Sequence, residues 1–94
     1  MFLLNDVNDL YNLFSEKVYA TGILDKKTKE LIAVGCSVMA DCVPCLEHHY
    51  QGAVSAGAKQ DELSEVLAIA MSISAGSKRA KYGPVISNLE QGKK

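Results

Sequence analysis

Two cysteines and a histidine near the middle of the chain have the types and spacing that thiol chemistry needs. Cys42 and Cys45 form a Cys-x-x-Cys pair, and His49 follows four residues after the second cysteine. Pro44 lies between the cysteines, and proline is tolerated in the first turn of a helix, so we expect a helix to begin here. Residues three apart on such a turn can form a disulfide, and residues four apart share one face. The sequence therefore predicts a dithiol with an imidazole one turn away.

Each member of this group has a chemical reason to be present. The thiolate is the nucleophilic form of cysteine, and a free thiol with a pKa near ~8.5 is mostly protonated at neutral pH. Unpaired amide groups at a helix start favour the thiolate, and an imidazole can accept the thiol proton, whereas Asp41 acts in the opposite direction. A second thiol lets oxidation stop at a reversible disulfide. These properties favour a thiol oxidoreductase.

Other interpretations of the same residues stay open. A structural zinc site could use Cys42, Cys45 and His49. It would then need a fourth ligand, and His48, otherwise a surface residue, would point about 100° away from His49 on a helix. The pair could also be inert core cysteines, since cysteine is often buried. Cys36 lies in an apolar segment without a polar companion, so we expect it to fill the core.

Glu30 is the candidate for a further member of the site. It directly precedes the apolar run 31–34, at the border of an apolar face. As an exposed acid it would pair with Lys26 or Lys27. If its helix packs against the cysteine helix, it could instead orient His49, as the third member of a nucleophile–base–orienter set. Spacing alone leaves these two interpretations about even.

The chain around these residues is predicted to be helical throughout. It contains only two prolines, and no alternation of apolar and polar residues is long enough for a strand. Glycines and short polar breaks divide it into about five segments, at residues 5–20, 25–40, 41–57, 61–76 and 77–91. Asp25 should cap the second segment, and Gly83 with Pro84 should stop or kink the fifth. The second and fourth segments are the most apolar, so we expect them to be deeply packed.

Length and composition limit the fold and the function. A chain of 94 residues suffices for one domain, residues 1–94, and its 48% of apolar residues exceed what one small core needs. That excess predicts burial against copies of the same chain in a closed symmetric assembly. A net charge of −1 gives no field for nucleic acid or an acidic membrane surface, and no run of ~18 apolar residues could span a bilayer. An odd number of cysteines, three, favours the cytoplasm.

Taken in order, several motifs resemble one known family. The chain resembles the alkylhydroperoxidase D-like branch of the carboxymuconolactone decarboxylase family over about residues 24–73. The resemblance is carried by residues 24–32, the pattern Cys42-x-x-Cys45-x-x-x-His49, residues 56–58 and the acidic stretch 61–63. Glu30 falls twelve residues before Cys42, where this branch keeps its relay glutamate. The sequence departs from the pattern at Pro44, where the best-known peroxidases of the branch carry a histidine. Those peroxidases are also about twice as long.

The resemblance implies a compact all-α domain and a homotrimer or homohexamer. It implies that Cys45 reacts with a hydroperoxide to become the sulfenic acid, and that Cys42 donates a proton and then closes the disulfide. His49, linked to Glu30 through water, would relay protons. A dihydrolipoyl or thioredoxin-like dithiol would reset the pair, with no metal or other cofactor. True lactone decarboxylases of the family lack the cysteine pair, so a non-redox enzyme is the less favoured alternative, beside a zinc-binding or structural module.

Overall fold

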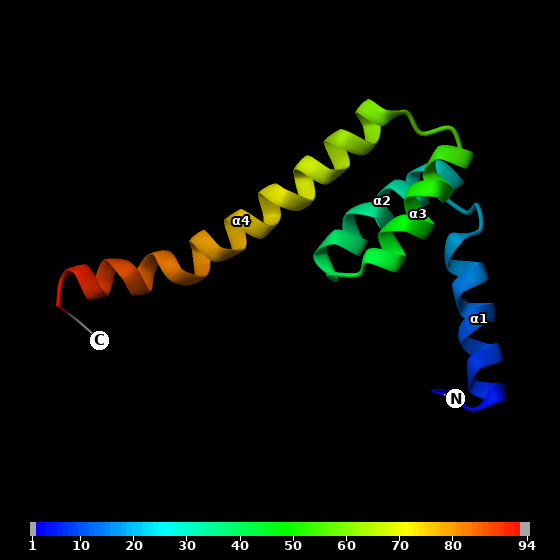
Figure 1. The fold of residues 1–94 in the computed structure, drawn as a ribbon, viewed down its shortest axis with the longest axis horizontal. Coiled ribbons are helices and arrows are strands. Elements are labelled where there is room, and N and C mark those ends of the chain that lie inside the picture. Colours follow the sequence, from blue (N-terminus) through cyan, green and yellow to red (C-terminus); the bar gives the residue numbers. More distant parts are fainter. Residues whose placement is uncertain (1, 93–94) are drawn as a thin grey trace.

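Four helices make up most of residues 2–92, the part of the chain that this computed structural model describes (Figure 1). They are α1 (Asn5–Tyr19), α2 (Lys26–Met39), α3 (Val43–Ser55) and α4 (Gln60–Glu90). Within this range no strand occurs, and no helix is both long and apolar enough to cross a bilayer. The predicted all-α class is confirmed, with four helices in the described residues instead of about five.

The difference in helix number arises in α4, which continues through Gly76 and Pro84. Proline inside a helix removes one backbone hydrogen bond and costs about 3 kcal/mol, but it need not end the helix. A proline ring normally clashes with the Cβ of the preceding residue and disfavours helical backbone angles there. Gly83 has no Cβ, so it can stay helical before Pro84 more easily than another residue could. In Figure 1 the orange and red part of α4 runs at an angle to its yellow part. The predicted boundary between segments 61–76 and 77–91 is therefore wrong.

The helix α2 is central and begins where the sequence predicts. The Asp25 carboxylate accepts a hydrogen bond from the Thr28 backbone N–H at 2.7 Å, which satisfies one of the free donors at the helix start. α2 packs against α3 and α4, and it also contacts α1 (Figure 1). This position lets side chains of α2 reach the helix that begins at the cysteine pair.

The core inside one chain is small. Its buried apolar residues are mostly alanines, and among residues 2–92 the largest side chains less than 2% exposed are those of Val34 and Leu63. The radius of gyration is 18.3 Å, whereas a compact chain of this length has about 12 Å. The expectation of a compact domain is therefore wrong, because α1 and the distal part of α4 extend away from the α2–α3 pair (Figure 1).

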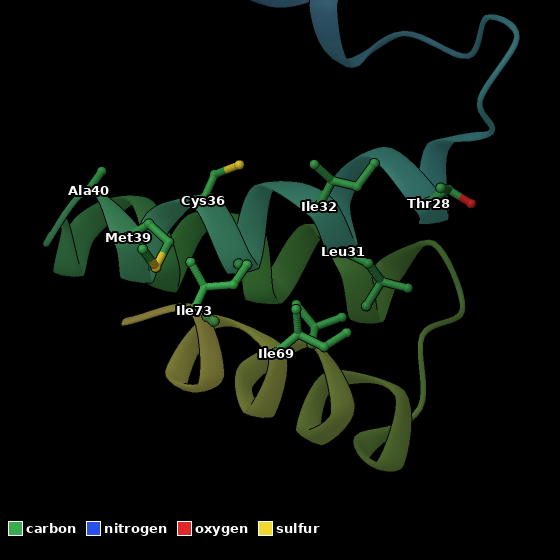
Figure 2. A pocket seen from close by; sticks show the side chains of 11 residues that line it. Thr28, Leu31, Ile32, Cys36, Met39, Ala40, Ile69 and Ile73 are labelled. Atoms are coloured by element: carbon green, nitrogen blue, oxygen red, sulfur yellow. The ribbon is translucent and has the colours of Figure 1, made fainter. Parts of the chain in front are cut away.

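A groove between α2 and α4 leaves much of their apolar surface open. Its volume is about 680 Å³, and Figure 2 shows Ile32 and Met39 of α2 and Ile69 and Ile73 of α4 among its lining residues. Ile69 and Ile73 are each more than half exposed. The second and fourth predicted segments are thus apolar but not deeply packed within a single chain.

Cys36 lies on the wall of this groove and is exposed. Figure 2 shows its sulfur pointing away from α4. The expectation that Cys36 fills the core is wrong for the single chain, because α3 and α4 cover only part of a helix that is apolar on nearly every side.

Candidate active site

A tight connection between α2 and α3 places the cysteines. Only residues 40–42 join the two helices. Asp41 adopts a φ of 54°, in the left-handed region that aspartate enters more readily than most residues. The backbone N–H of Cys42 then donates to the Ser37 carbonyl at 3.0 Å, which ties the start of α3 to the end of α2.

The cysteine pair begins α3, as the sequence predicts. Cys42 is the N-cap residue and Pro44 lies in the first turn. The two cysteines are joined by a disulfide with their Cα atoms 5.2 Å apart, and Cys36 is free. The backbone N–H of Cys45 donates to the Cys42 sulfur at 3.2 Å, so this sulfur takes the capping role that an oxygen usually has. Cys45 is exposed and Cys42 is half-buried, so Cys45 is the more exposed residue of the pair.

Glu30 is buried in α2 and contacts His49 of α3 directly. Its side chain is 5% exposed, and its Oε2 lies 2.9 Å from His49 Nδ1. Its other oxygen, Oε1, lies 3.2 Å from Lys26 Nζ. Glu30 therefore pairs with both Lys26 and His49, the two partners that residue spacing left open. The contact with His49 is direct, whereas the family resemblance implied a bridging water. Lys27 pairs with Glu62 of α4 at 2.8 Å instead.

Opposing influences set the charge of Glu30. Burial raises its pKa, but hydrogen bonds from His49 and Lys26, together with the positive charge of Lys26, outweigh burial and hold the pKa below its ordinary value of 4.5. The carboxylate is therefore charged at neutral pH. Its stabilising effect is present above the ordinary pKa and is lost as the pH falls through the lowered one.

The charged carboxylate also decides which imidazole nitrogen can exchange protons with a thiol. We assign the proton to Nδ1 of His49, because this nitrogen faces the Glu30 carboxylate at 2.9 Å. The assignment leaves Nε2 as the nitrogen that can accept a proton. Since His49 lies one turn after Cys45 on α3, the arrangement can supply a nucleophile, a base and an orienting carboxylate in that order.

Gly52 of α3 gives the Glu30 carboxylate the space that it occupies. A Cβ built on Gly52 would lie 2.5 Å from Glu30 Oε2 and 2.8 Å from its Cδ, closer than real Cβ contacts come. The close approach of α2 and α3 at the site thus depends on a residue without a side chain. Sequence reasoning missed Gly52, whose only signal is a glycine inside a helix, three residues after His49.

We expect Gly52→Ala to displace the Glu30 carboxylate from His49. The hydroperoxide reaction that the family resemblance predicts for Cys45 should slow by about tenfold, a modest acid–base contribution. Overpacking of this kind should also lower the free energy of unfolding by about 1–3 kcal/mol. The matched control is Gly76→Ala, because nothing lies within 4 Å of a Cβ built at that helical position. Equal rates in the two variants would contradict the role given to Gly52.

Two aromatic side chains flank the His49 imidazole. The Tyr19 ring, at the end of α1, has its centroid 4.6 Å away at an interplanar angle of 39°. The His48 ring lies 4.9 Å away at 74°. His48 is exposed, as expected for a surface residue, whereas sequence reasoning gave Tyr19 no role. A pocket of about 580 Å³ beside Glu30 is lined by Lys26, His48 and residues of α1 that include Tyr19.

The arrangement does not favour the zinc interpretation. Among residues 2–92, no three His, Cys, Asp or Glu side chains are grouped so that they could hold a metal ion.

The chain is similar to known proteins over most of its length. The model of the carboxymuconolactone decarboxylase family matches residues 5–82. A crystal structure from Methanobacterium thermoautotrophicum is 35% identical, with a TM-score of 0.80 over 87% of this chain and 92% of that chain. One from Thermotoga maritima, described as a family member with a suggested involvement in the antioxidative response, is 28% identical, with a TM-score of 0.66 over 96% and 98%. Uncharacterized protein 4 in the cox locus of Paracoccus denitrificans is 33% identical over 85 residues, 90% of this chain and 77% of that protein.

Proposed function

Because the chain belongs to the carboxymuconolactone decarboxylase family, we propose that it is a thiol-dependent peroxidase of the alkylhydroperoxidase D-like type. The observation that carries the proposal is an exposed Cys45, paired with Cys42, one helical turn before a histidine that a buried Glu30 orients. The antioxidative involvement suggested for the Thermotoga maritima relative supports the same chemistry.

The oxidative half of the cycle consumes one hydroperoxide. His49 accepts the Cys45 proton at Nε2, and the thiolate attacks the terminal oxygen of the hydroperoxide. The O–O bond breaks, the alkoxide takes the proton from His49 and leaves as the alcohol, and Cys45 becomes a sulfenic acid. The Cys42 sulfur then attacks the Cys45 sulfur, and the Cys42 proton leaves with the hydroxyl group as water. Two thiols are thereby oxidised to a disulfide, and the hydroperoxide is reduced to an alcohol and water.

The reductive half needs a dithiol, for which we propose a dihydrolipoyl or thioredoxin-like protein. Its thiolate attacks the exposed Cys45, and Cys42 leaves as a thiolate that the Cys45 N–H and the start of α3 stabilise. The second thiol of the reductant attacks the mixed disulfide and releases Cys45. Because the cycle requires a reducing compartment, the proposed location is the cytoplasm.

Peroxide titration with peptide mapping tests the proposal. The fully reduced chain should consume one equivalent of an organic hydroperoxide and release one equivalent of the alcohol. Mapping should then find Cys42 bonded to Cys45, and Cys36 still open to alkylation. A bridge that includes Cys36, or a hydroperoxide that is not consumed, would contradict it. Stoichiometric zinc in protein purified without added metal would support the metal-binding alternative.

The surface of the chain supports a homo-oligomer, which we propose to be a trimer or hexamer. The chain exposes 7466 Å², whereas a compact monomer of 10.1 kDa exposes about 5,300 Å². The excess is larger than the roughly 800 Å² that each partner buries in a standard interface. Exposed apolar side chains gather on three surfaces, which are the α2–α4 groove, α1 and the distal part of α4.

A charge in the groove should prevent this assembly. Light scattering should give three or six times the chain mass of 10.1 kDa for the unaltered protein and a lower multiple for Ile69→Glu. The reason is that an unpaired carboxylate is costly to bury in an apolar interface. Gln91→Glu, at an exposed position beyond α4, adds the same charge and should keep the full mass. An unaltered chain that runs as a monomer would refute the proposed assembly.

A further inference from the structure

We propose that Tyr19 is a positioning residue, whose ring holds the His49 imidazole against Glu30. The expected effects on reaction rate rest on the function proposed above. The position of the His49 ring can be measured without any turnover. It assigns a task to the end of α1, a helix that otherwise makes few contacts with the rest of the chain.

The contact between the two rings is the first observation. The centroids of Tyr19 and His49 lie 4.6 Å apart, with the planes tilted by 39°, and the His49 side chain is only 12% exposed. An imidazole has a broad, nearly two-fold preference about its last torsion, so a ring against its face selects one of its orientations. The orientation present directs Nδ1 at Glu30 Oε2, at 2.9 Å. The Tyr19 hydroxyl makes no hydrogen bond among residues 2–92, which leaves the ring as the part that acts.

The second observation is how the end of α1 is anchored. Lys29 Nζ donates to the carbonyls of Val18 and Ala20, at 2.9 and 2.7 Å. Lys26 Nζ donates to the Tyr19 carbonyl at 3.1 Å and lies 5.9 Å from its ring centroid. These bonds satisfy carbonyls that the last turn of a helix leaves without partners. The backbone that carries Tyr19 is therefore held against α2, the helix of Glu30.

Lys26 links these two observations at one nitrogen. The same Nζ that holds the Tyr19 carbonyl also lies 3.2 Å from Glu30 Oε1. Tyr19, Lys26, Glu30 and His49 thus form one connected group in which α1, α2 and α3 each contribute. Loss of the Tyr19 ring would free the imidazole to turn its Nδ1 away from the carboxylate and would open that face to water.

Two substitutions at this position separate the ring from the hydroxyl. Tyr19→Phe keeps the ring and should react with a hydroperoxide within about twofold of the unaltered rate. Tyr19→Leu keeps apolar bulk without a ring and should react about tenfold more slowly, the size of effect that a misplaced base produces. The measurement is the single-turnover rate of the reduced protein, with the thermal unfolding midpoint of each variant recorded beside it.

Nitrogen-15 NMR of the His49 ring gives a readout that a purely structural role would not change. The Nδ1–H signal should be protected from exchange with water in the unaltered protein and in Tyr19→Phe, and exchange faster in Tyr19→Leu. Should Tyr19→Leu fail to fold, Lys29→Met releases the α1 carbonyls without altering either ring and should weaken the same signal. A protected signal in Tyr19→Leu or in Lys29→Met, or a Tyr19→Phe variant as slow as Tyr19→Leu, would overturn the proposal. If no variant reduces peroxide but the NMR pattern holds, the proposed function fails and the positioning role stands.

Discussion

Replacement of Cys45 by serine should lower the rate of hydroperoxide reduction by roughly 10³-fold or more, the usual scale for loss of a covalent nucleophile. The serine hydroxyl keeps its proton at neutral pH, so His49 has no thiol to deprotonate. Cys42 cannot replace the missing group, because it is the less exposed of the two cysteine residues and precedes His49 by almost two helical turns. The expected result is a folded chain with an intact Glu30–His49 contact and no turnover.

Two matched variants make this result specific. Cys36→Ser should keep the full rate, because Cys36 lies on the groove wall and is free. Cys42→Ser should consume one equivalent of hydroperoxide and stop at a sulfenic acid that a dimedone probe can trap. In the same variant, thiol titration against pH reports the acidity of Cys45 directly. Activity that survives Cys45→Ser would instead support non-redox chemistry on this scaffold.

Glu30→Gln should slow the reaction of Cys45 by about ten- to a hundredfold, the low end of general acid–base contributions. Glutamine has nearly the same shape, so the packing beside Gly52 is retained while the negative charge is lost. The amide can present either its oxygen or its NH2 group to Nδ1 of His49, so the proton is no longer fixed there and Nε2 is no longer reserved as the acceptor. Lys26 also loses its partner at Oε1.

Stopped-flow kinetics at several pH values measures this effect. Glu62→Gln is the matched control, because Glu62 is also a carboxylate with a lowered pKa and a lysine partner, but it caps α4 and does not touch His49. Stability gives an independent check: the difference in unfolding free energy between the unaltered chain and Glu30→Gln should shrink as the pH falls through the lowered Glu30 pKa. An unchanged rate would leave Glu30 with a structural role only.

Some features of the fold and the site could be predicted from the sequence because they depend on neighbours within one helical turn. Asp25 caps α2, and Pro44 marks the start of α3, since both effects involve backbone groups three or four residues away. The pairing of Cys42 with Cys45 follows in the same way from their spacing. The all-α class is equally local, since it follows from periodicity and the lack of strand patterns.

Other features were beyond prediction because they depend on residues far apart in the chain. Residue spacing could not choose between Lys26 and His49 as the partner of Glu30, the family resemblance favoured His49 through a water, and the packing of α2 on α3 provides both contacts directly. The same packing gives Gly52 its importance, and the anchoring of α1 brings Tyr19 onto the imidazole. No spacing rule connects residues 19, 30, 49 and 52 before the helices are placed.

The sequence by itself determined which residues are the candidates for thiol chemistry and that Cys42, Cys45 and His49 follow one helix, because 3.6 residues per turn fixes relations within a helix. Only the tertiary structure decided that a buried carboxylate completes the group, that Cys36 lies on an open groove, and that residues 60–90 form one helix. The physical reason is that burial and long-range contacts depend on which surfaces meet. In this chain the positions of the apolar residues do not by themselves specify which surfaces meet, because the chain carries more apolar surface than its own core can cover.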